Sequence, residues 1–170
     1  MITSRFSNGK ISSVSEEAYS LYSKSRIGEK KENKVEYTFY EAIYLMDKKK
    51  MEMFLGSKKI KSEELVKKLG RYEKRLEIKY AVFSDLRSKG YLVKSAFKFG
   101  ADFRVYEKGV KPGEEHALWI LECFRENEKI TWKEFAAKNR IAHSTKKRLL
   151  IAVVDGEGDV SYYQCDWLRT

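Results

Sequence analysis

Cysteines, histidines and long apolar stretches are all scarce in this 170-residue sequence. The two cysteines, Cys123 and Cys165, have no CxxC spacing, so we expect a reduced cytosolic protein without structural zinc. No apolar run approaches the roughly 20 residues that span a bilayer, and the longest charge-free run of that kind covers residues 149–154. The first ten residues lack the apolar segment of a signal peptide, so neither a membrane span nor secretion is expected.

Acidic residues are also in deficit, because 25 Asp and Glu stand against 35 Lys and Arg, a net charge of +10. A basic surface attracts phosphate groups and displaces their counterions, so nucleic acid is the expected partner. Residues 1–90 carry a net charge of +8. Residues 149–170 instead carry a net charge of −3, since four acidic residues are balanced by Arg169 alone. This acidic segment in a basic protein needs an explanation of its own.

Hydrophobic residues make up 42% of the chain and aromatic residues 14%, which is enough for a packed core. The Asn8-Gly9 pair predicts a small hairpin, followed by a short helix and a charged loop over residues 26–34. Helical spacing then predicts three helices. They run from the Thr38 and Glu41 capping-box pattern to the lysines at 48–50, from Ser62 to Gly70, and from Arg71 to Lys89. We expect a domain boundary near Gly70, with a small mixed domain at 1–70 and a second domain at 71–170.

After Gly90 the apolar period changes from helical to two, which is typical of strands. Alternation over residues 97–106 predicts one strand that buries Phe103 and Val105 and turns Tyr106 to its polar face. The expected order thereafter is a loop at 107–115, a strand at 117–124, a helix from Thr131 toward 142–147, a strand at 149–154, a tight turn at 155–159 and a strand at 160–165. These elements predict an α/β fold in which a mixed sheet flanked by helices carries an active site at its edge.

Few side chains are available for acid or base chemistry. The two histidines are His116 and His143, so any imidazole acid or base is one of them. His116 is expected at an accessible junction between a loop and a strand, whereas His143 falls in a helical stretch. Tyr106 is one of eleven tyrosines, and Lys147 belongs to a basic triplet. Each of these residues taken alone is more typical of packing or of a solvated charge than of catalysis.

Three segments together resemble archaeal tRNA-splicing endonuclease subunits. They are GYLVKSAFKFGADFRVYEKG at 90–109, EEH at 114–116 and AHSTKKRLLIAVVDGEGDVSYY at 142–163. In that family a Tyr ends the KFGADFRVY strand, a His follows the Gly-rich loop and a Lys lies in the AHSxxK segment. Tyr106, His116 and Lys147 match those positions. The YEAIYL segment and residues 59–65 also resemble the N-terminal domain of the family, so the resemblance covers nearly the whole chain.

The resemblance implies cleavage of precursor tRNA at bulge-helix-bulge intron junctions without metal or cofactor. The 2′-hydroxyl beside the scissile phosphate attacks it, which leaves a 2′,3′-cyclic phosphate and a 5′-hydroxyl. The implied roles are Tyr106 as the base or the group that positions the 2′-hydroxyl, His116 as the acid, and Lys147 as the stabiliser of the oxyanion. Because tyrosine ordinarily has a pKa near about 10, Tyr106 needs a nearby cation, which Lys147 or Arg104 would supply.

The resemblance also implies residues for RNA binding and assembly. Arg140 matches the family's arginine that stacks on a bulged base, and its partner is Tyr162 or Trp167. The acidic turn corresponds to a loop that inserts into a basic cleft of a neighbouring subunit. Its acidic residues are Asp155, Glu157 and Asp159. The implied partners are precursor tRNA and further subunits, in a homotetramer or in a heterotetramer with a second subunit type.

Two alternatives stay open. The catalytic fold of the family resembles restriction endonucleases, whose metal-dependent members hold Mg²⁺ with an Asp and a Glu-x-Lys pair on adjacent strands. Glu77 and Lys79 fall in a predicted helix, and Glu122 has no lysine two residues later, which argues against a metal-dependent nuclease. The other alternative is a noncatalytic RNA-binding or structural subunit of the same assembly. The complete set of three candidate catalytic residues favours a catalytic subunit.

Overall fold

Residues 1–109 and 116–168 are described by the computed structural model, and they form the mixed α/β fold expected from the sequence. Packing divides the chain into two compact units, Met1–Tyr80 and Ala81–Thr170. The boundary near Gly70 stays a prediction. The predicted loop at 107–115 lies largely outside the described residues, because 110–115 are not among them.

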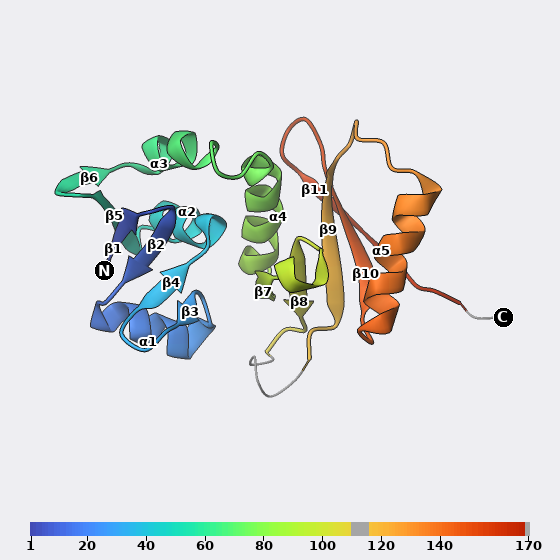
Figure 1. The fold of residues 1–170 in the computed structure, drawn as a ribbon, viewed down its shortest axis with the longest axis horizontal. Coiled ribbons are helices and arrows are strands. Elements are labelled where there is room, and N and C mark those ends of the chain that lie inside the picture. Colours follow the sequence, from blue (N-terminus) through green and yellow to red (C-terminus); the bar gives the residue numbers. More distant parts are fainter. Residues whose placement is uncertain (110–115, 169–170) are drawn as a thin grey trace. The chain divides into compact units, whose positions relative to one another are not determined.

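The first unit contains a six-stranded sheet in the order β3-β4-β2-β1-β5-β6. β1 and β5 pair in parallel, whereas the other neighbours are antiparallel. The elements that begin in this unit are β1 (Ile2–Ser7), β2 (Lys10–Ser13), α1 (Glu16–Ser25), β3 (Glu29–Lys30), β4 (Val35–Tyr37), α2 (Phe39–Asp47), β5 (Met51–Leu55), β6 (Lys58–Ile60), α3 (Ser62–Leu69) and α4 (Leu76–Ser88) (Figure 1). The expected loop at 26–34 therefore contains the short strand β3.

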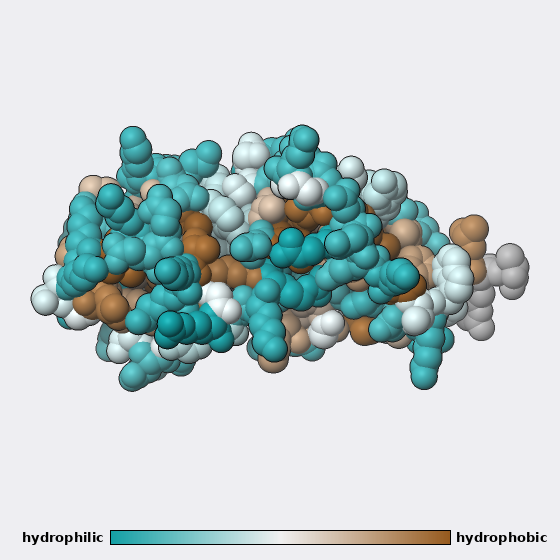
Figure 2. Space-filling view, turned by 90° about the horizontal axis from the view of Figure 1, so that it is seen from above, coloured by the Kyte–Doolittle hydropathy of each residue, from teal (hydrophilic) through white to brown (hydrophobic). Residues whose placement is uncertain are grey.

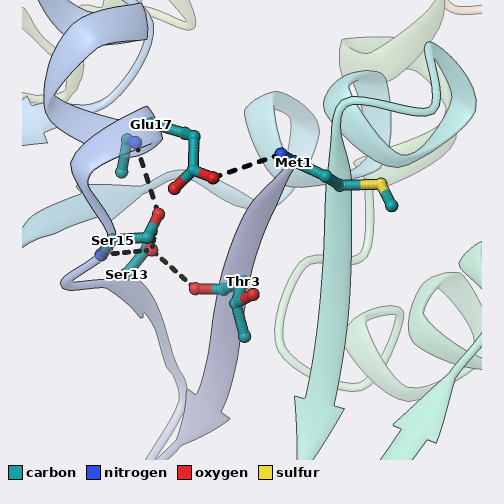
Figure 3. A network of polar contacts seen from close by, with 6 residues as sticks. Met1, Thr3, Ser13, Ser15 and Glu17 are labelled. Atoms are coloured by element: carbon teal, nitrogen blue, oxygen red, sulfur yellow. Dashed lines mark hydrogen bonds and ion pairs between the residues drawn. The ribbon is translucent and has the colours of Figure 1, made fainter.

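A polar network fixes the start of α1 (Figure 3). The Ser15 hydroxyl accepts a hydrogen bond from the Ala18 amide, as expected of a helix N-cap. The Ser13 hydroxyl donates to the Thr3 carbonyl oxygen at 2.6 Å and so ties β2 to β1. The capping box at α2 is confirmed, because Thr38 and Glu41 each accept a hydrogen bond from the other's backbone amide.

The second unit contains a five-stranded sheet in the order β11-β10-β9-β8-β7. β9 and β10 pair in parallel and the other neighbours are antiparallel, which confirms the predicted mixed sheet. Its remaining elements are β7 (Leu92–Ser95), a 3₁₀ turn (Phe97–Phe99), β8 (Phe103–Tyr106), β9 (Trp119–Arg125), α5 (Trp132–Ser144), β10 (Arg148–Val154) and β11 (Val160–Cys165) (Figure 1).

Helices cover both faces of this sheet. On one face, the rings of Phe83 in α4 and Phe103 in β8 lie 6.2 Å apart. On the other face, Ala142 of α5 packs in a buried cluster with Ile120 of β9 and Leu149 of β10. Because side chains alternate along each strand, these contacts assign every strand residue to the α4 face or the α5 face.

The single strand predicted over residues 97–106 is wrong. Phe97–Phe99 form a 3₁₀ turn, and Gly100 follows in the left-handed region at φ 69°. The strand proper begins at Phe103. Before that point the apolar residues alternate within a turn, where Phe97 is 88% exposed and Phe99 is half-buried. Alternation of apolar residues was therefore not sufficient evidence for a strand.

The predicted helix from Arg71 to Lys89 starts later than expected. α4 begins at Leu76. Before it, the amides of Tyr72 and Glu73 both donate to the carbonyl oxygen of Leu69, which continues the end of α3 into a turn. Tyr72 is 59% exposed and its ring packs edge-on against Phe6, so it lies outside α4 and faces a different neighbour.

Hydrophilic side chains cover most of the face seen in Figure 2, with smaller apolar areas between them. Exposed aromatic side chains include Trp132 at 85% and Trp167 at 50%. Within residues 1–109 and 116–168, no helix has both the length and the apolar character needed to cross a membrane.

Candidate active site

The sheet of the second unit brings three strand ends together. β8 is antiparallel to β9, and β9 is parallel to β10, so the end of β8 meets the beginnings of β9 and β10. Leu118 joins all three, because its amide donates to the Val105 carbonyl oxygen at 3.0 Å and its carbonyl oxygen accepts from the Arg148 amide at 3.0 Å. Tyr106, His116 and Lys147 each lie within two residues of this junction in sequence. We call this end of the sheet the junction end.

Tyr106 is the last residue of β8. The alternation of the strand is as predicted, with Phe103 and Val105 toward α4 and Arg104 and Tyr106 on the α5 face. The expectation that Tyr106 lies on an exposed polar face is wrong, because the residue is only 7% exposed and packs with Leu92 and Ala117. Its cross-strand partner on β7 is Leu92, and this apolar neighbour removes the ring from solvent.

His116 is exposed and lies two residues before Leu118. It stands at the point where the chain enters β9, as the sequence predicted. His143 is exposed as well and belongs to the last turn of α5. The sequence reasoning favoured His116 over His143, but both histidines lie at the junction end of the sheet.

Lys147 is positioned by the way α5 ends. The helix starts at a confirmed capping box between Thr131 and Glu134 and closes at Thr145. Lys146 then adopts the left-handed region at φ 55°, and the Lys147 amide donates to the Ala142 carbonyl oxygen at 2.8 Å. The Lys147 ammonium donates to the Thr145 carbonyl oxygen at 2.8 Å. A cation at this position also interacts favourably with the negative end of the helix dipole.

Lys147 has an unusual electrostatic environment. Partial burial lowers the pKa of its ammonium, and the nearby Arg104 guanidinium lowers that pKa further. Both cations lie beside the same ring, with the Lys147 Nζ and the Arg104 Cζ each 5.7 Å from the Phe99 centroid. The Arg104 Nε donates to the Ser95 carbonyl oxygen at 3.1 Å. Two cations therefore share one aromatic ring close to the end of β8.

An open groove of ≈ 530 Å³ lies beside Lys147. Its walls come from the chain just before β9, from the last turn of α5 and from the start of β10. The lining residues are Leu118, His143, Ser144, Lys146, Lys147 and Arg148. Since three of the six are Lys or Arg and none is acidic, the groove attracts phosphate groups.

The residues singled out for RNA binding separate onto two faces. Trp167 lies beyond β11, which returns to the junction end, and its ring meets the His143 ring edge-on at 4.2 Å. Arg140 is exposed one turn before His143 on α5. Tyr162 lies on the α4 face, where its hydroxyl donates to the Asp85 carboxylate at 2.7 Å. The geometry brings Trp167, and not Tyr162, to the face of the sheet that α5 covers.

The acidic turn lies at the opposite end of the sheet, where β10 leads into β11 (Figure 1). Seven-residue β10 separates it from the junction end, a span of about 20 Å at roughly 3.3 Å per residue. The Asp155 carboxylate accepts hydrogen bonds from the amides of Glu157 and Asp159, both at 2.9 Å, and so holds the turn. The Gly156 amide donates to the Glu126 carboxylate at 3.0 Å.

Two features of the site were missed by sequence reasoning. They are the position of Phe99 beside two cations and the place of His143 in the basic groove. The sequence does hold a signal for the second, because His143 is three residues after Arg140 and four before Lys147 across a helix end. The sequence holds no such signal for Phe99, because a phenylalanine that contacts two cations and one that packs in a core have the same sequence pattern.

Comparisons with known proteins agree with this geometry. Residues 76–162 match the family model of the tRNA intron endonuclease catalytic C-terminal domain, and residues 2–66 match that of the N-terminal domain. A tRNA-splicing endonuclease of Methanothermobacter thermautotrophicus is 39% identical over 149 residues, which is 88% of this chain and 86% of the relative. One of Thermococcus gammatolerans is 37% identical over 171 residues and 99% of both chains. One of Nanoarchaeum equitans is 41% identical over 140 residues, 79% of this chain and 90% of the relative.

The two family models together cover most of the chain, and the three archaeal relatives match it over 86%, 99% and 90% of their own length. The resemblance inferred from the sequence is therefore confirmed. Tyr106, His116 and Lys147 all lie within residues 76–162, the range of the catalytic-domain match. This chain belongs to the tRNA intron endonuclease family.

Proposed function

We propose that this chain is a catalytic subunit of a tRNA-splicing endonuclease. It cleaves precursor tRNA at bulge-helix-bulge junctions and leaves a 2′,3′-cyclic phosphate and a 5′-hydroxyl. The observation that carries this proposal is the convergence of Tyr106, His116 and Lys147 at one end of a single sheet. The names of the relatives support a tRNA substrate. Such a substrate agrees with the cytoplasmic location that the sequence predicts.

The proposed chemistry is a transphosphorylation within the RNA. The 2′ oxygen forms a bond to phosphorus as its proton passes to the phenolate oxygen of Tyr106, or to solvent where Tyr106 only positions the hydroxyl. The bond from phosphorus to the 5′ oxygen breaks as the His116 imidazolium protonates that oxygen. The Lys147 ammonium binds the oxyanion of the pentacoordinate phosphorus. The half-buried position of Lys147 supports its role, since charge interactions strengthen away from water.

Binding of the bulged RNA is assigned to Arg140 and Trp167. Both belong to the α5 side of the sheet, near the basic groove. An exposed guanidinium and an exposed indole are suited to stack on an unpaired base. The half-buried Tyr162 is a weaker choice, because its hydroxyl is engaged by Asp85 on the other face.

Cleavage is expected to survive excess EDTA, because the three proposed groups supply a base, an acid and a cation without a metal. The measurement is the single-turnover rate of cleavage of a bulge-helix-bulge RNA in EDTA and in Mg²⁺. Rates that agree within a few-fold support the assignment. If chelation abolishes cleavage and Mg²⁺ restores it, the roles given to the three residues are wrong. RNA binding without cleavage in either buffer favours the noncatalytic alternative.

The acidic turn is assigned to subunit assembly. Its distance from the junction end keeps it away from the RNA-cleaving groups of its own chain. Asp155, Glu157 and Asp159 are all exposed on an otherwise basic protein, so the turn complements the basic surface of a second subunit. The partner is another copy, giving a homotetramer, or a second subunit type, giving a heterotetramer.

Reversing two charges in the turn is expected to weaken the assembly. Glu157→Lys combined with Asp159→Lys leaves the Asp155 carboxylate, which holds the turn, in place. Exposed substitutions usually cost little stability, so the fold persists while opposite-charge attraction is lost. Light scattering at low micromolar concentration gives the mass. The matched control is Glu32→Lys with Glu63→Lys, which makes the same charge change at exposed sites elsewhere. An unchanged mass in the turn variant would show that the turn has no role in assembly.

A further inference from the structure

Arg104 is a charged residue at the junction end. The proposed chemistry assigns no direct role to it. It lies two residues before Tyr106 on β8, and both side chains are on the α5 face, roughly 7 Å apart along the strand. Its cross-strand partner on β9 is Ile120, a member of the cluster under α5. Arg104 therefore lies on the same side of the sheet as Tyr106 and beside the same ring as Lys147.

The Arg104 guanidinium and the Lys147 ammonium are both positioned beside the Phe99 ring. Each is 5.7 Å from the centroid of the Phe99 ring, whose face attracts cations. Each also donates to a backbone carbonyl oxygen, Arg104 to Ser95 at 3.1 Å and Lys147 to Thr145 at 2.8 Å. These contacts fix the positions of two groups that repel each other.

Among the described residues, no carboxylate forms an ion pair with either cation of this pair. In the part of the chain that the structure describes, neither Arg104 nor Lys147 forms a salt bridge. Other lysines of the described chain do have a carboxylate partner, such as Lys59 with Glu52 and Lys138 with Glu122. Two cations that interact electrostatically, one of them partly buried and neither paired with a described carboxylate, can receive a ligand anion.

We infer that Arg104 and Lys147 form a two-cation phosphate site on the Phe99 ring, in which both bind the non-bridging oxygens of one RNA phosphate. This inference rests on the proposed function and deepens it. A phosphodiester carries one negative charge and the pentacoordinate species carries two, so a second cation matches the charge that develops during the reaction. The planar guanidinium can also bind two phosphate oxygens at once, which orients the phosphate toward Tyr106.

The first arm of the test measures binding to a bulge-helix-bulge RNA with a 2′-deoxy nucleotide at the cleavage position, which prevents cleavage. The logarithm of affinity is plotted against the logarithm of salt concentration for wild type, Arg104→Gln and Arg104→Lys. Loss of one phosphate contact lowers the slope by about 0.7 to 1. We expect that loss in Arg104→Gln and a slope near wild type in Arg104→Lys.

The control for this arm is Lys98→Gln, which removes an exposed cation next to Phe99 in sequence. Its binding slope is expected to stay within error of wild type, as is its cleavage rate. On cleavable RNA, Arg104→Gln is expected to slow the single-turnover step by roughly 10²-fold, the scale of one lost oxyanion donor. Thermal unfolding of each variant identifies any loss of fold. If Arg104→Gln unfolds, Arg104→Lys still tests the proposal.

The second arm uses inorganic phosphate and does not depend on cleavage. Nuclear magnetic resonance signals of the Arg104 Nε and the Lys147 ammonium are expected to shift together on titration with phosphate, and the Lys147 signal is expected to shift less in Arg104→Gln. This result supports the site even if the wild-type chain fails to cleave RNA. If the chain cleaves RNA but Arg104→Gln keeps the wild-type slope and phosphate response, Arg104 has at most a structural role and the inference is overturned.

Discussion

Replacement of His116 by alanine is expected to slow RNA cleavage by roughly 10²- to 10⁴-fold, the usual loss for a general acid. The 5′ oxygen leaves poorly without a proton, and His116 is the exposed imidazole at the entry to β9. RNA affinity should be largely retained, because the phosphate-binding cations remain. The measurement is the single-turnover rate at saturating enzyme, together with the dissociation constant for the RNA with a 2′-deoxy nucleotide at the cleavage position.

The matched control is His143→Ala, since it removes the other histidine of the sequence. His143 lines the basic groove and packs edge-on against Trp167, so its loss is expected to weaken RNA binding. The chemical step at saturating enzyme should change much less than in His116→Ala. The reverse order of single-turnover rates would transfer the proton donor to His143 and overturn the assignment of His116.

Removal of the Lys147 charge, as in Lys147→Met, is expected to lower the cleavage rate by roughly 10²- to 10³-fold. The wild-type rate should also fall at high pH before an ordinary lysine would lose its charge. Burial and Arg104 lower the pKa of Lys147, so its charged form is complete below that pKa and disappears as the pH rises through it. The measurement is the pH profile of the single-turnover rate.

Two variants separate Lys147 from other groups that titrate in the same range. Lys147→Arg keeps the positive charge to higher pH and is expected to extend the alkaline side of the profile. Arg104→Gln removes the repulsion from Lys147, so the alkaline side of its profile should move to higher pH, although its maximal cleavage rate is lower. A limb that moves in neither variant belongs to another group, and the role given to Lys147 in the transition state would then need to be withdrawn.

Local structure was largely readable from the sequence. The capping boxes at Thr38 and Thr131 were recognised because a hydroxyl and a glutamate three residues apart satisfy the free amides of a helix start within one turn. The apolar run that became β10 and the turn after Asp155 also depend on neighbouring residues alone. The family itself was recognisable from the order and spacing of three segments, and the comparisons confirm it.

Only the tertiary structure decided what each side chain of the site meets. Period two placed Tyr106 on the outer face of its strand, but β7 and the chain before β9 cover it with Leu92 and Ala117. Likewise, the contact of Phe99 with two cations depends on the turn at Gly100 and on the end of α5. Burial and charge pairing are set by segments distant in the sequence, and a local pattern therefore predicts an element but not its neighbours.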